Sequence, residues 1–307
     1  MPNVQLVALC EKSRLIRRFI RRILKGINIV DDAVKLAGLD LDAVCITTPI
    51  PSHFPIAKTI YREKIARNLF VEKTLASNYE EAKQLCELAE RFGNVNMVGY
   101  MRRFTVTFKK AKELINEDAI GDIESFNAYA FSSDFYESKK GLKAPDARGG
   151  VLRDLGCHAI DIALWFFGDL QVNSVKPDFI VGNNSEDAAC FEAKNSKGVK
   201  GTFDISWCAE NYRMPEVGIT INGSKGNIEV NDDKVMLKLD DGKISTWYRH
   251  DLNDNVFYWL GGPEYFCEDE YFIKSILKGG KTEPDFHIAS KVDKIIDQVK
   301  SKADKHE

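Results

Sequence analysis

A regular alternation of short apolar runs and amphipathic segments shapes the first third of the chain. Runs rich in valine and isoleucine occur at residues 4–10, 43–47 and 68–72, and apolar residues at helical spacing separate them. Continuous apolar strands that alternate with helices are typical of a parallel sheet covered on both faces. The sequence therefore predicts an α/β fold with a parallel sheet in its N-terminal part.

After about residue 100 the pattern changes, and strands follow one another without intervening helices. A helix is predicted near residues 108–115, and another begins at the glycine pair 149–150 and runs to about 167. Turn residues separate the strands that follow, and two helices at about 265–277 and 287–302 close the chain. This pattern predicts a C-terminal α+β domain with a large, mostly antiparallel open sheet.

Composition and charge exclude several classes of function. The 307 residues carry a formal net charge of −3, so bulk electrostatics give no reason to expect nucleic acid or a membrane as partner. The longest strongly apolar stretch is too short to span a bilayer, and the amino terminus lacks the plan of a signal peptide. The seven cysteines never form CxxC, and Cys45, Cys157 and Cys190 lie in apolar runs as small hydrophobes. We therefore expect reduced thiols and a cytoplasmic protein.

The predicted strand at residues 43–47 ends in a segment suited to holding part of a nucleotide. Thr47 is the last residue of this strand. Thr48 and Pro49 follow directly, and His53 lies four residues further along the chain. Ligands of an open parallel sheet bind beyond the carboxyl ends of its strands, where hydroxyls and backbone amides can hold a ribose or a nicotinamide. The structural alternative is a strand-to-helix loop in which Ser52 caps the next helix.

Glu72 and Lys73 end the predicted strand at residues 68–72, on the same ligand-binding edge. The lysine ammonium can hydrogen-bond a reacting hydroxyl and lower the pKa of that hydroxyl. The structural alternative is a solvated lysine at the end of a strand.

The segment GGVLRDLGCHAID, residues 149–161, places Asp154 and His158 four residues apart at the start of an apolar helical stretch. Residues i and i+4 share one helix face, so the two side chains can point into one cleft. A histidine suits proton transfer during oxidation of an alcohol, and the aspartate can orient it. The structural alternative is Asp154 as a helix cap and His158 as a core histidine. No HExxH motif or His/Cys cluster accompanies the pair, so no metal site is predicted.

Further motifs stand in order around this segment: DAVCITTPIPSH (42–53), VEKTLASN (71–78), GYMRRF (99–104), IGDIESF (120–126) and EDEYFIKSILKGGKTEPDF (268–286). With GGVLRDLGCHAIDIALWFFG (149–168), they make nearly the whole chain resemble the Gfo/Idh/MocA oxidoreductases, which include inositol and glucose-fructose dehydrogenases. The resemblance implies a Rossmann-type dinucleotide-binding domain at residues 1–100. It implies a substrate and oligomerisation domain at residues 101–307.

The same resemblance implies a function. Members of the family use NAD(P) to oxidise or reduce a carbon that bears a hydroxyl, usually in a sugar or cyclic polyol. They are often homodimers or homotetramers joined through the C-terminal sheet. Carried over by position, Lys73 contacts the substrate and the nicotinamide ribose, Asp154 is the orienting carboxylate, and His158 is the general acid/base. The implied cofactor-binding residues are Glu11, Thr47, Thr48, Pro49, His53, Glu72 and Lys73, and the implied substrate residues are Arg102, Asp134 and Tyr212.

An acidic residue, Glu11, follows the predicted strand at residues 4–10. It matches the residue that accepts hydrogen bonds from the adenosine ribose, which favours NAD. Lys12 and Arg14 lie close by and can instead meet the 2′-phosphate of NADP. The arginines at positions 14, 17, 18, 21 and 22 are interpreted as a solvated helix face opposite an apolar stripe, with a nucleic-acid patch as the alternative.

The chain departs from the family at Thr74, which replaces the usual proline after Lys73. A cis peptide bond before a residue other than proline costs roughly 2.5–4 kcal/mol, so we expect a trans bond here.

A second departure concerns the start of the Rossmann pattern, because no first strand or GxGxxG turn precedes residue 4. That turn and the helix after it bind the pyrophosphate, so we expect this chain to bind dinucleotide poorly. We also expect residues 4–10 and 43–47 either to pair directly or to leave buried backbone groups unpaired. Two interpretations stay open: a start assigned too far downstream in a longer enzyme, or a non-catalytic relative with a sugar-sensing or regulatory role.

Overall fold

The computed structural model describes the chain except for residues 2, 93, 139–140, 142, 144–147, 179–184, 255, 257–261 and 304–307. The chain divides into two compact units. The first unit comprises Met1–Gly99 and Asp269–Ser290, and the second comprises Tyr100–Glu268 and Lys291–Glu307. The sequence prediction placed residues 269–290 in the second domain, 101–307. In the structure these residues belong to the first unit.

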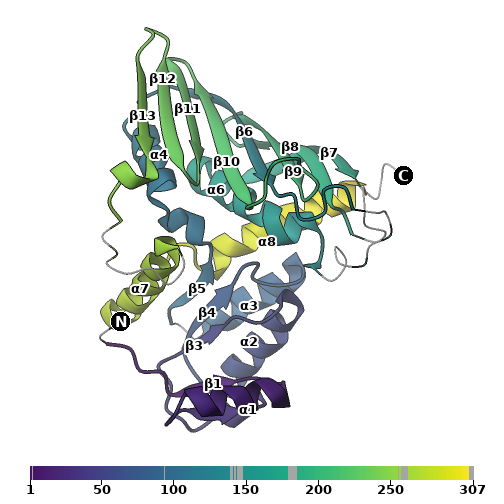
Figure 1. Ribbon diagram of the computed structural model, residues 1–307, viewed down its shortest axis with the longest axis vertical. Helices are drawn as coiled ribbons and strands as arrows, with labels where there is room; N and C mark the ends of the chain where they lie inside the picture. Colours follow the sequence, from purple (N-terminus) through teal and green to yellow (C-terminus); the bar gives the residue numbers. More distant parts are fainter. Residues whose placement is uncertain are drawn as a thin grey trace. The chain divides into compact units, whose positions relative to one another are not determined.

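A three-stranded parallel sheet forms the centre of the first unit, in the order β3 (Ala43–Ile46), β4 (Asn68–Glu72) and β5 (Asn96–Gly99). The helices α2 (His53–Arg62) and α3 (Tyr79–Phe92) accompany these strands (Figure 1). Four of the five residues of β4 are buried, which explains why its sequence is almost continuously apolar.

The strands β1 (Ala8–Cys10) and β2 (Asn28–Val30) form a separate two-stranded parallel sheet in the first unit. Among the described residues β1 does not pair with β3, so the predicted direct pairing is wrong. The alternative of unpaired buried backbone stays a prediction: Cys10 and Cys45 are exposed and no residue of β1 is buried, whereas Ile46 of β3 is buried. Backbone groups at such open edges can hydrogen-bond to water.

The helix α1 (Arg14–Ile23) begins at Ser13, whose side chain accepts a hydrogen bond from the Ile16 amide at 3.4 Å. Arg14, Arg18, Arg21 and Arg22 are exposed, as the predicted solvated arginine face requires, whereas Arg17 is half-buried. Arg17 donates to the carbonyls of Glu11 and Lys12 at 2.7 and 2.6 Å. The predicted apolar stripe of α1 is not buried, because four of its residues are exposed, namely Leu15, Ile16, Phe19 and Ile23.

The second unit is built on an eight-stranded sheet in the order β13-β12-β11-β10-β6-β9-β8-β7. The strands are β6 (Ile123–Phe131), β7 (Leu170–Asp178), β8 (Ala188–Asn195), β9 (Lys200–Ser206), β10 (Glu216–Gly223), β11 (Gly226–Asn231), β12 (Lys234–Leu239) and β13 (Ile244–Tyr248). Neighbours pair antiparallel except β6 and β9, which are parallel. The mostly antiparallel open sheet predicted from the sequence is confirmed.

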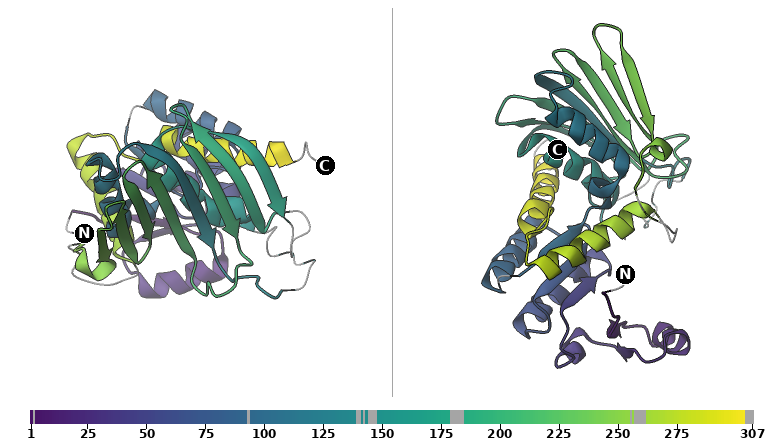
Figure 2. Two further views of the ribbon diagram at one scale, coloured as in Figure 1. Left: turned by 90° about the horizontal axis from the view of Figure 1, so that it is seen from above. Right: turned by 90° about the vertical axis from the view of Figure 1, so that its left-hand side faces the viewer.

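One face of this sheet is covered by α4 (Val106–Asn116) and α6 (Cys157–Phe167) (Figure 1). Buried and exposed residues alternate strictly along β8 and β9, as expected where a sheet is covered on one face. The left view of Figure 2 looks onto the other face, over which no helix is drawn among the described residues of this unit. In the core, the rings of Phe126 and Phe167 stack at 4.3 Å and join the sheet to α6.

Two helices near the C-terminus, α7 (Pro263–Lys278) and α8 (Phe286–Ala303), each contribute residues to both units. No helix within the described ranges has the length and apolar character needed to cross a membrane. Cys157 is buried as expected, whereas Cys45 and Cys190 are exposed, so their predicted role as buried hydrophobes is wrong. Both lie on strands with an open edge or face, which their apolar neighbours in the sequence did not indicate.

Candidate active site

The predicted cofactor-binding residues lie where the strands of the first unit end. Glu11 follows β1, Thr47 to Pro49 follow β3, and Lys73 follows β4. Thr47 and Pro49 are exposed, while Thr48 and Lys73 are half-buried. The carboxyl ends of parallel strands are where α/β sheets bind their ligands, so the fold presents these residues as the sequence predicted.

His53 is fully buried and joins two of these strand ends. Its Nδ1 lies 2.8 Å from the Thr74 carbonyl oxygen, and its Nε2 lies 2.6 Å from the Thr48 carbonyl oxygen. Burial lowers the pKa of His53, and the two carbonyl contacts oppose that shift. Because the ring has no exposed surface, any contribution to a cofactor site is indirect, through the loops that carry Thr48 and Lys73.

The peptide bond between Lys73 and Thr74 is cis, so the predicted trans bond is wrong. Thr74 is fully buried; its carbonyl oxygen lies against His53, and its hydroxyl donates to the Ala76 carbonyl at 3.2 Å. These tertiary contacts surround the bond and could not be read from the local sequence.

Glu72 and Glu11 each accept a hydrogen bond from a nearby backbone amide through one carboxylate oxygen. The Lys73 amide donates to Glu72 at 3.3 Å, and the Ser13 amide donates to Glu11 at 2.6 Å. Burial raises the pKa of Glu72, the amide and charge of Lys73 oppose the shift, and Asp269 adds to it. Ser52 hydrogen-bonds Thr48 and the Pro49 carbonyl, so the structural alternative of Ser52 as a side-chain cap for α2 is wrong.

This donor set fits the two ends of a dinucleotide. Glu11 retains a carboxylate oxygen for ribose hydroxyls, and Thr47, Thr48 and Lys73 offer hydroxyl, amide and ammonium groups.

Asp154 lies in a π-helical turn, Leu152–Gly156, that leads directly into α6. Its amide donates to the Gly150 carbonyl at 3.1 Å, and its side chain is 32 % exposed. His158 follows in the first turn of α6, is buried, and packs edge-on against Tyr100 at 6.3 Å between ring centroids. Single π turns occur often at functional sites, and here one supplies the predicted Asp–His pair. Asp154 does not cap a helix, which corrects the structural alternative.

Gly150 permits this turn to form beside Glu186. Its φ is +91°, a conformation that favours glycine, and a Cβ there would lie 2.3 Å from Glu186 Oε1. Glu186 in turn accepts a hydrogen bond from the Leu152 amide at 3.3 Å.

Arg148, which the sequence interpretation missed, joins two of the predicted site residues. Its Nη1 pairs closely with Asp134 and lies 3.6 Å from the Asp154 carboxylate. Its guanidinium carbon lies 5.3 Å from the Phe135 ring centroid and 5.6 Å from that of Trp207. Its position directly before the Gly149–Gly150 pair was the one available signal.

Tyr212 belongs to the same region of the second unit. Its amide donates to the Ser133 hydroxyl at 2.8 Å, and its carbonyl accepts from the Ser133 amide at 2.8 Å. Its ring lies 5.1 Å from that of Phe131. The predicted substrate residues Asp134 and Tyr212 therefore sit on two loops that are hydrogen-bonded to each other.

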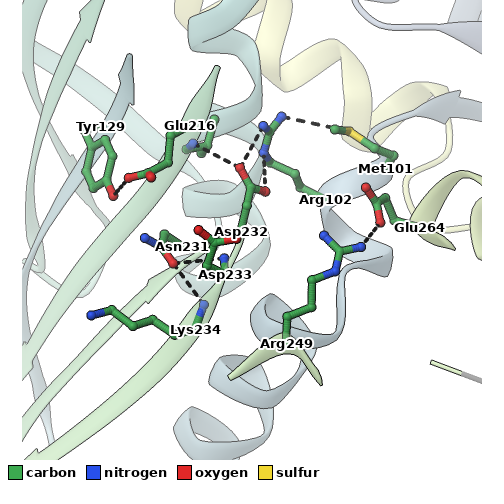
Figure 3. Close-up of polar contacts among 11 residues, drawn as sticks. Met101, Arg102, Tyr129, Glu216, Asn231, Asp232, Asp233, Lys234, Arg249 and Glu264 are labelled. Carbon is green, nitrogen blue, oxygen red and sulfur yellow. Dashed lines mark hydrogen bonds and ion pairs between the residues drawn. The ribbon is translucent and has the colours of Figure 1, made fainter. Parts of the chain in front are cut away.

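Arg102 occupies a different environment, shown in Figure 3. Its Nε and Nη2 donate to the two carboxylate oxygens of Asp232 at 3.1 and 3.0 Å. Asp232 also accepts from the Val217 amide at 3.3 Å. The fork of the predicted substrate residue is thus occupied by a protein carboxylate among the described residues.

The predicted site residues are divided between the two units, each described by itself. The first unit carries Glu11, Thr47, Thr48, Pro49, His53, Glu72 and Lys73, and the second carries Arg102, Asp134, Asp154, His158 and Tyr212. Within the described ranges no group of three His, Cys, Asp or Glu side chains is arranged to hold a metal ion.

Known proteins match this chain over most of its length. Residues 2–100 match the profile described as an oxidoreductase family with an NAD-binding Rossmann fold, and residues 108–229 match the GFO/IDH/MocA C-terminal domain. The inositol 2-dehydrogenase of Rhizobium meliloti is 25% identical over 269 residues, covering 82% of this chain and 75% of that protein. A galactose/lactose metabolism regulatory protein of Kluyveromyces lactis is 23% identical over 226 residues, covering 63% of this chain and 49% of that protein.

The fold is also that of solved dehydrogenases. The structure of a levoglucosan dehydrogenase in complex with NADH and levoglucosan superimposes with a TM-score of 0.86 at 21% identity, covering 97% of this chain and 88% of that one. The two family profiles follow each other along the chain in the order of the two predicted domains. The chain belongs to the Gfo/Idh/MocA family of oxidoreductases, with an NAD-binding Rossmann-type N-terminal region.

Proposed function

We propose that this protein is an NAD(P)-dependent dehydrogenase acting on a CH–OH group of a sugar or cyclic polyol, in the manner of an inositol 2-dehydrogenase. The observation that carries the proposal is the Asp154–His158 pair, set by a π turn at the head of α6. A partly exposed carboxylate four residues before a buried imidazole suits a pair that must take a proton and hold the resulting charge.

In this proposal the residues divide the work of oxidation. Lys73 donates a hydrogen bond to the reacting hydroxyl and stabilises negative charge on its oxygen. His158 accepts the hydroxyl proton, and Asp154 stabilises the protonated imidazole. When NAD is bound, its nicotinamide supplies the acceptor for the hydride that leaves the same carbon.

The cofactor residues have a matching division. Glu11 accepts hydrogen bonds from the adenosine ribose, which favours NAD over NADP, while Lys12 and Arg14 keep NADP open. Thr47, Thr48 and Pro49 hold the nicotinamide half together with Glu72 and Lys73. His53 contributes by fixing the loops on either side of it, as its contacts with the carbonyls of Thr48 and Thr74 suggest.

Assembly and compartment belong to the same proposal. The face of the eight-stranded sheet without helices, seen in Figure 2, suits a homodimer or homotetramer interface. The free thiols expected from scattered cysteines suit a cytoplasmic protein.

A non-catalytic, sugar-sensing or regulatory role is the second candidate. It is favoured by one relative, which is a regulatory protein of galactose and lactose metabolism. The two candidates differ in one property: both bind a sugar, but only a dehydrogenase reduces NAD with it.

One experiment separates these candidates. Inositol and sugar binding is measured by titration calorimetry, and NADH formation is followed by absorbance with saturating NAD and the same compounds. Binding with NADH formation supports the dehydrogenase, and binding without it supports the regulatory protein.

A further inference from the structure

In the sheet of the second unit, β6 and β9 are the one parallel pair among the described strands. Because the two strands run the same way, the loops that follow them lie at the same edge of the sheet. Residues 132–136 follow β6, residues 207–212 follow β9, and Trp207 and Tyr212 bond to the first loop. The edge is therefore a built surface with two interlocked loops.

Arg148 lies on this edge above two buried rings. Phe135 and Trp207 are 7% and 1% exposed, and the Phe135 amide donates to the Trp207 carbonyl at 3.0 Å. The guanidinium lies over both rings, an arrangement that stabilises a cation through the ring faces. Its platform is thus fixed by the core.

Two carboxylates lie against one nitrogen, Nη1, of the Arg148 guanidinium. Nη1 pairs with Asp134 from the β6 loop and lies 3.6 Å from Asp154 of the π turn. Arginine has five N–H donors, and the described residues give no hydrogen-bond partner to its Nε or Nη2 groups. The side chain as a whole is 44% exposed, so Arg148 is accessible to a ligand.

We infer that Arg148 is a substrate-binding residue that hydrogen-bonds two neighbouring hydroxyl oxygens of a neutral polyhydroxylated ligand. The inference rests on the proposed function for the identity of Asp154 as a site residue. A planar fork of N–H donors matches paired oxygens. Asp134 and Asp154 already lie against the Arg148 guanidinium, so a second carboxylate from a ligand is disfavoured there and a neutral sugar or polyol is favoured over a sugar acid.

The test measures affinity in the full chain by titration calorimetry with myo-inositol, levoglucosan and D-glucuronate. Arg148→Ala should weaken binding of the neutral compound that the wild type prefers by at least about tenfold. Arg148→Lys, which keeps the charge but not the fork, should fall between the two. Arg91→Ala removes another exposed arginine, on α3, and should leave the affinity within about twofold.

The outcomes separate this inference from the proposed function. Equal affinity in the wild type and Arg148→Ala overturns the inference, as does tighter binding of D-glucuronate than of both neutral compounds. A wild type that binds none of the three also overturns it. Sugar binding that is lost in Arg148→Ala, with no NADH formed by the wild type, supports the inference and contradicts the proposed dehydrogenase.

Discussion

At the scale of single residues, His53 shows how one side chain can shape a site without touching a ligand. It lies in α2, yet its ring nitrogens contact the carbonyl oxygens of Thr48 and Thr74 in two separate loops. The sequence placed it correctly behind the TTP segment, but it gave no sign that the ring would face inward. Burial and the two carbonyl contacts are tertiary properties.

His53 should make stability depend on pH. Its pKa is lowered in the folded state, so the unfolded state binds its proton first as the pH falls. Stability from His53 is therefore complete above about pH 6.5, its ordinary pKa, and is lost as the pH falls toward the lowered value. Urea unfolding at several pH values should show the wild type losing stability more steeply than His53→Gln, by at most about 1.4 kcal/mol per pH unit.

The matched control for this measurement is His287→Gln, since His287 is exposed. Its stability curve should run closely parallel to that of the wild type across neutral pH. A His53→Gln curve with the same slope as the wild type, or a steeper one, would be incompatible with a His53 pKa that burial lowers.

The buried pair Arg103–Asp161 should be costly to break from one side. Two hydrogen bonds of 2.8 and 2.7 Å join it, and the side chains are only 3% and 1% exposed. Removing one partner leaves a buried charge, so Arg103→Met alone should lower the free energy of unfolding by about 3–5 kcal/mol. The double variant Arg103→Met/Asp161→Leu should recover much of that loss.

A double-mutant cycle by chemical denaturation measures this coupling. Equal losses in the single and the double variant would mean that packing, and not charge burial, sets the cost. The exposed pair Lys225–Asp118, with side chains 64% and 69% exposed, serves as the control and should show a coupling below about 1 kcal/mol.

At the scale of elements, the sequence predicted what local pattern decides. Its predicted strand at residues 68–72 has the observed bounds of β4, because the apolar pattern of this segment is strong. It missed β7, which contains Pro177, and the short β13. Both are edge strands, where proline and polar residues are tolerated, so their sequences resemble loops.

For the candidate site too, local pattern predicted some features and not others. Motif order placed Lys73, Asp154 and His158, and the fold puts Lys73 after β4 and the other two in the π turn and α6. The cis bond at Thr74, the Asp232 partner of Arg102 and the bridging position of Arg148 depend on residues distant in sequence. No local pattern carries that information.

The exposed apolar face of α1 leads to a stability prediction at this scale. Leu15 is 79% exposed, whereas Leu69 in β4 has no exposed surface. Leu15→Ala should change the free energy of unfolding by less than about 0.5 kcal/mol, and Leu69→Ala should lower it by about 2–5 kcal/mol. Urea denaturation of both variants tests this, and a large loss in Leu15→Ala would show that this face is covered in solution.

At the scale of the whole molecule, the chain joins two units with different tasks. The first matches an NAD-binding profile and ends its parallel strands in the proposed cofactor residues. The second holds the large sheet, the proposed acid/base pair and the Arg148 cluster. Family membership follows from the two matching profiles. The loops that follow β6 and β9 belong to the proposed substrate site.

NADH formation from neutral polyols tests the central proposal most directly. Wild type and His158→Ala are compared at saturating NAD with inositols and levoglucosan, from about pH 6 to about pH 9, where a histidine base changes its protonation. We expect substrate-dependent NADH formation that rises with pH in the wild type and falls by at least about 100-fold in His158→Ala. No NADH with any compound, or an undiminished rate in His158→Ala, would contradict it.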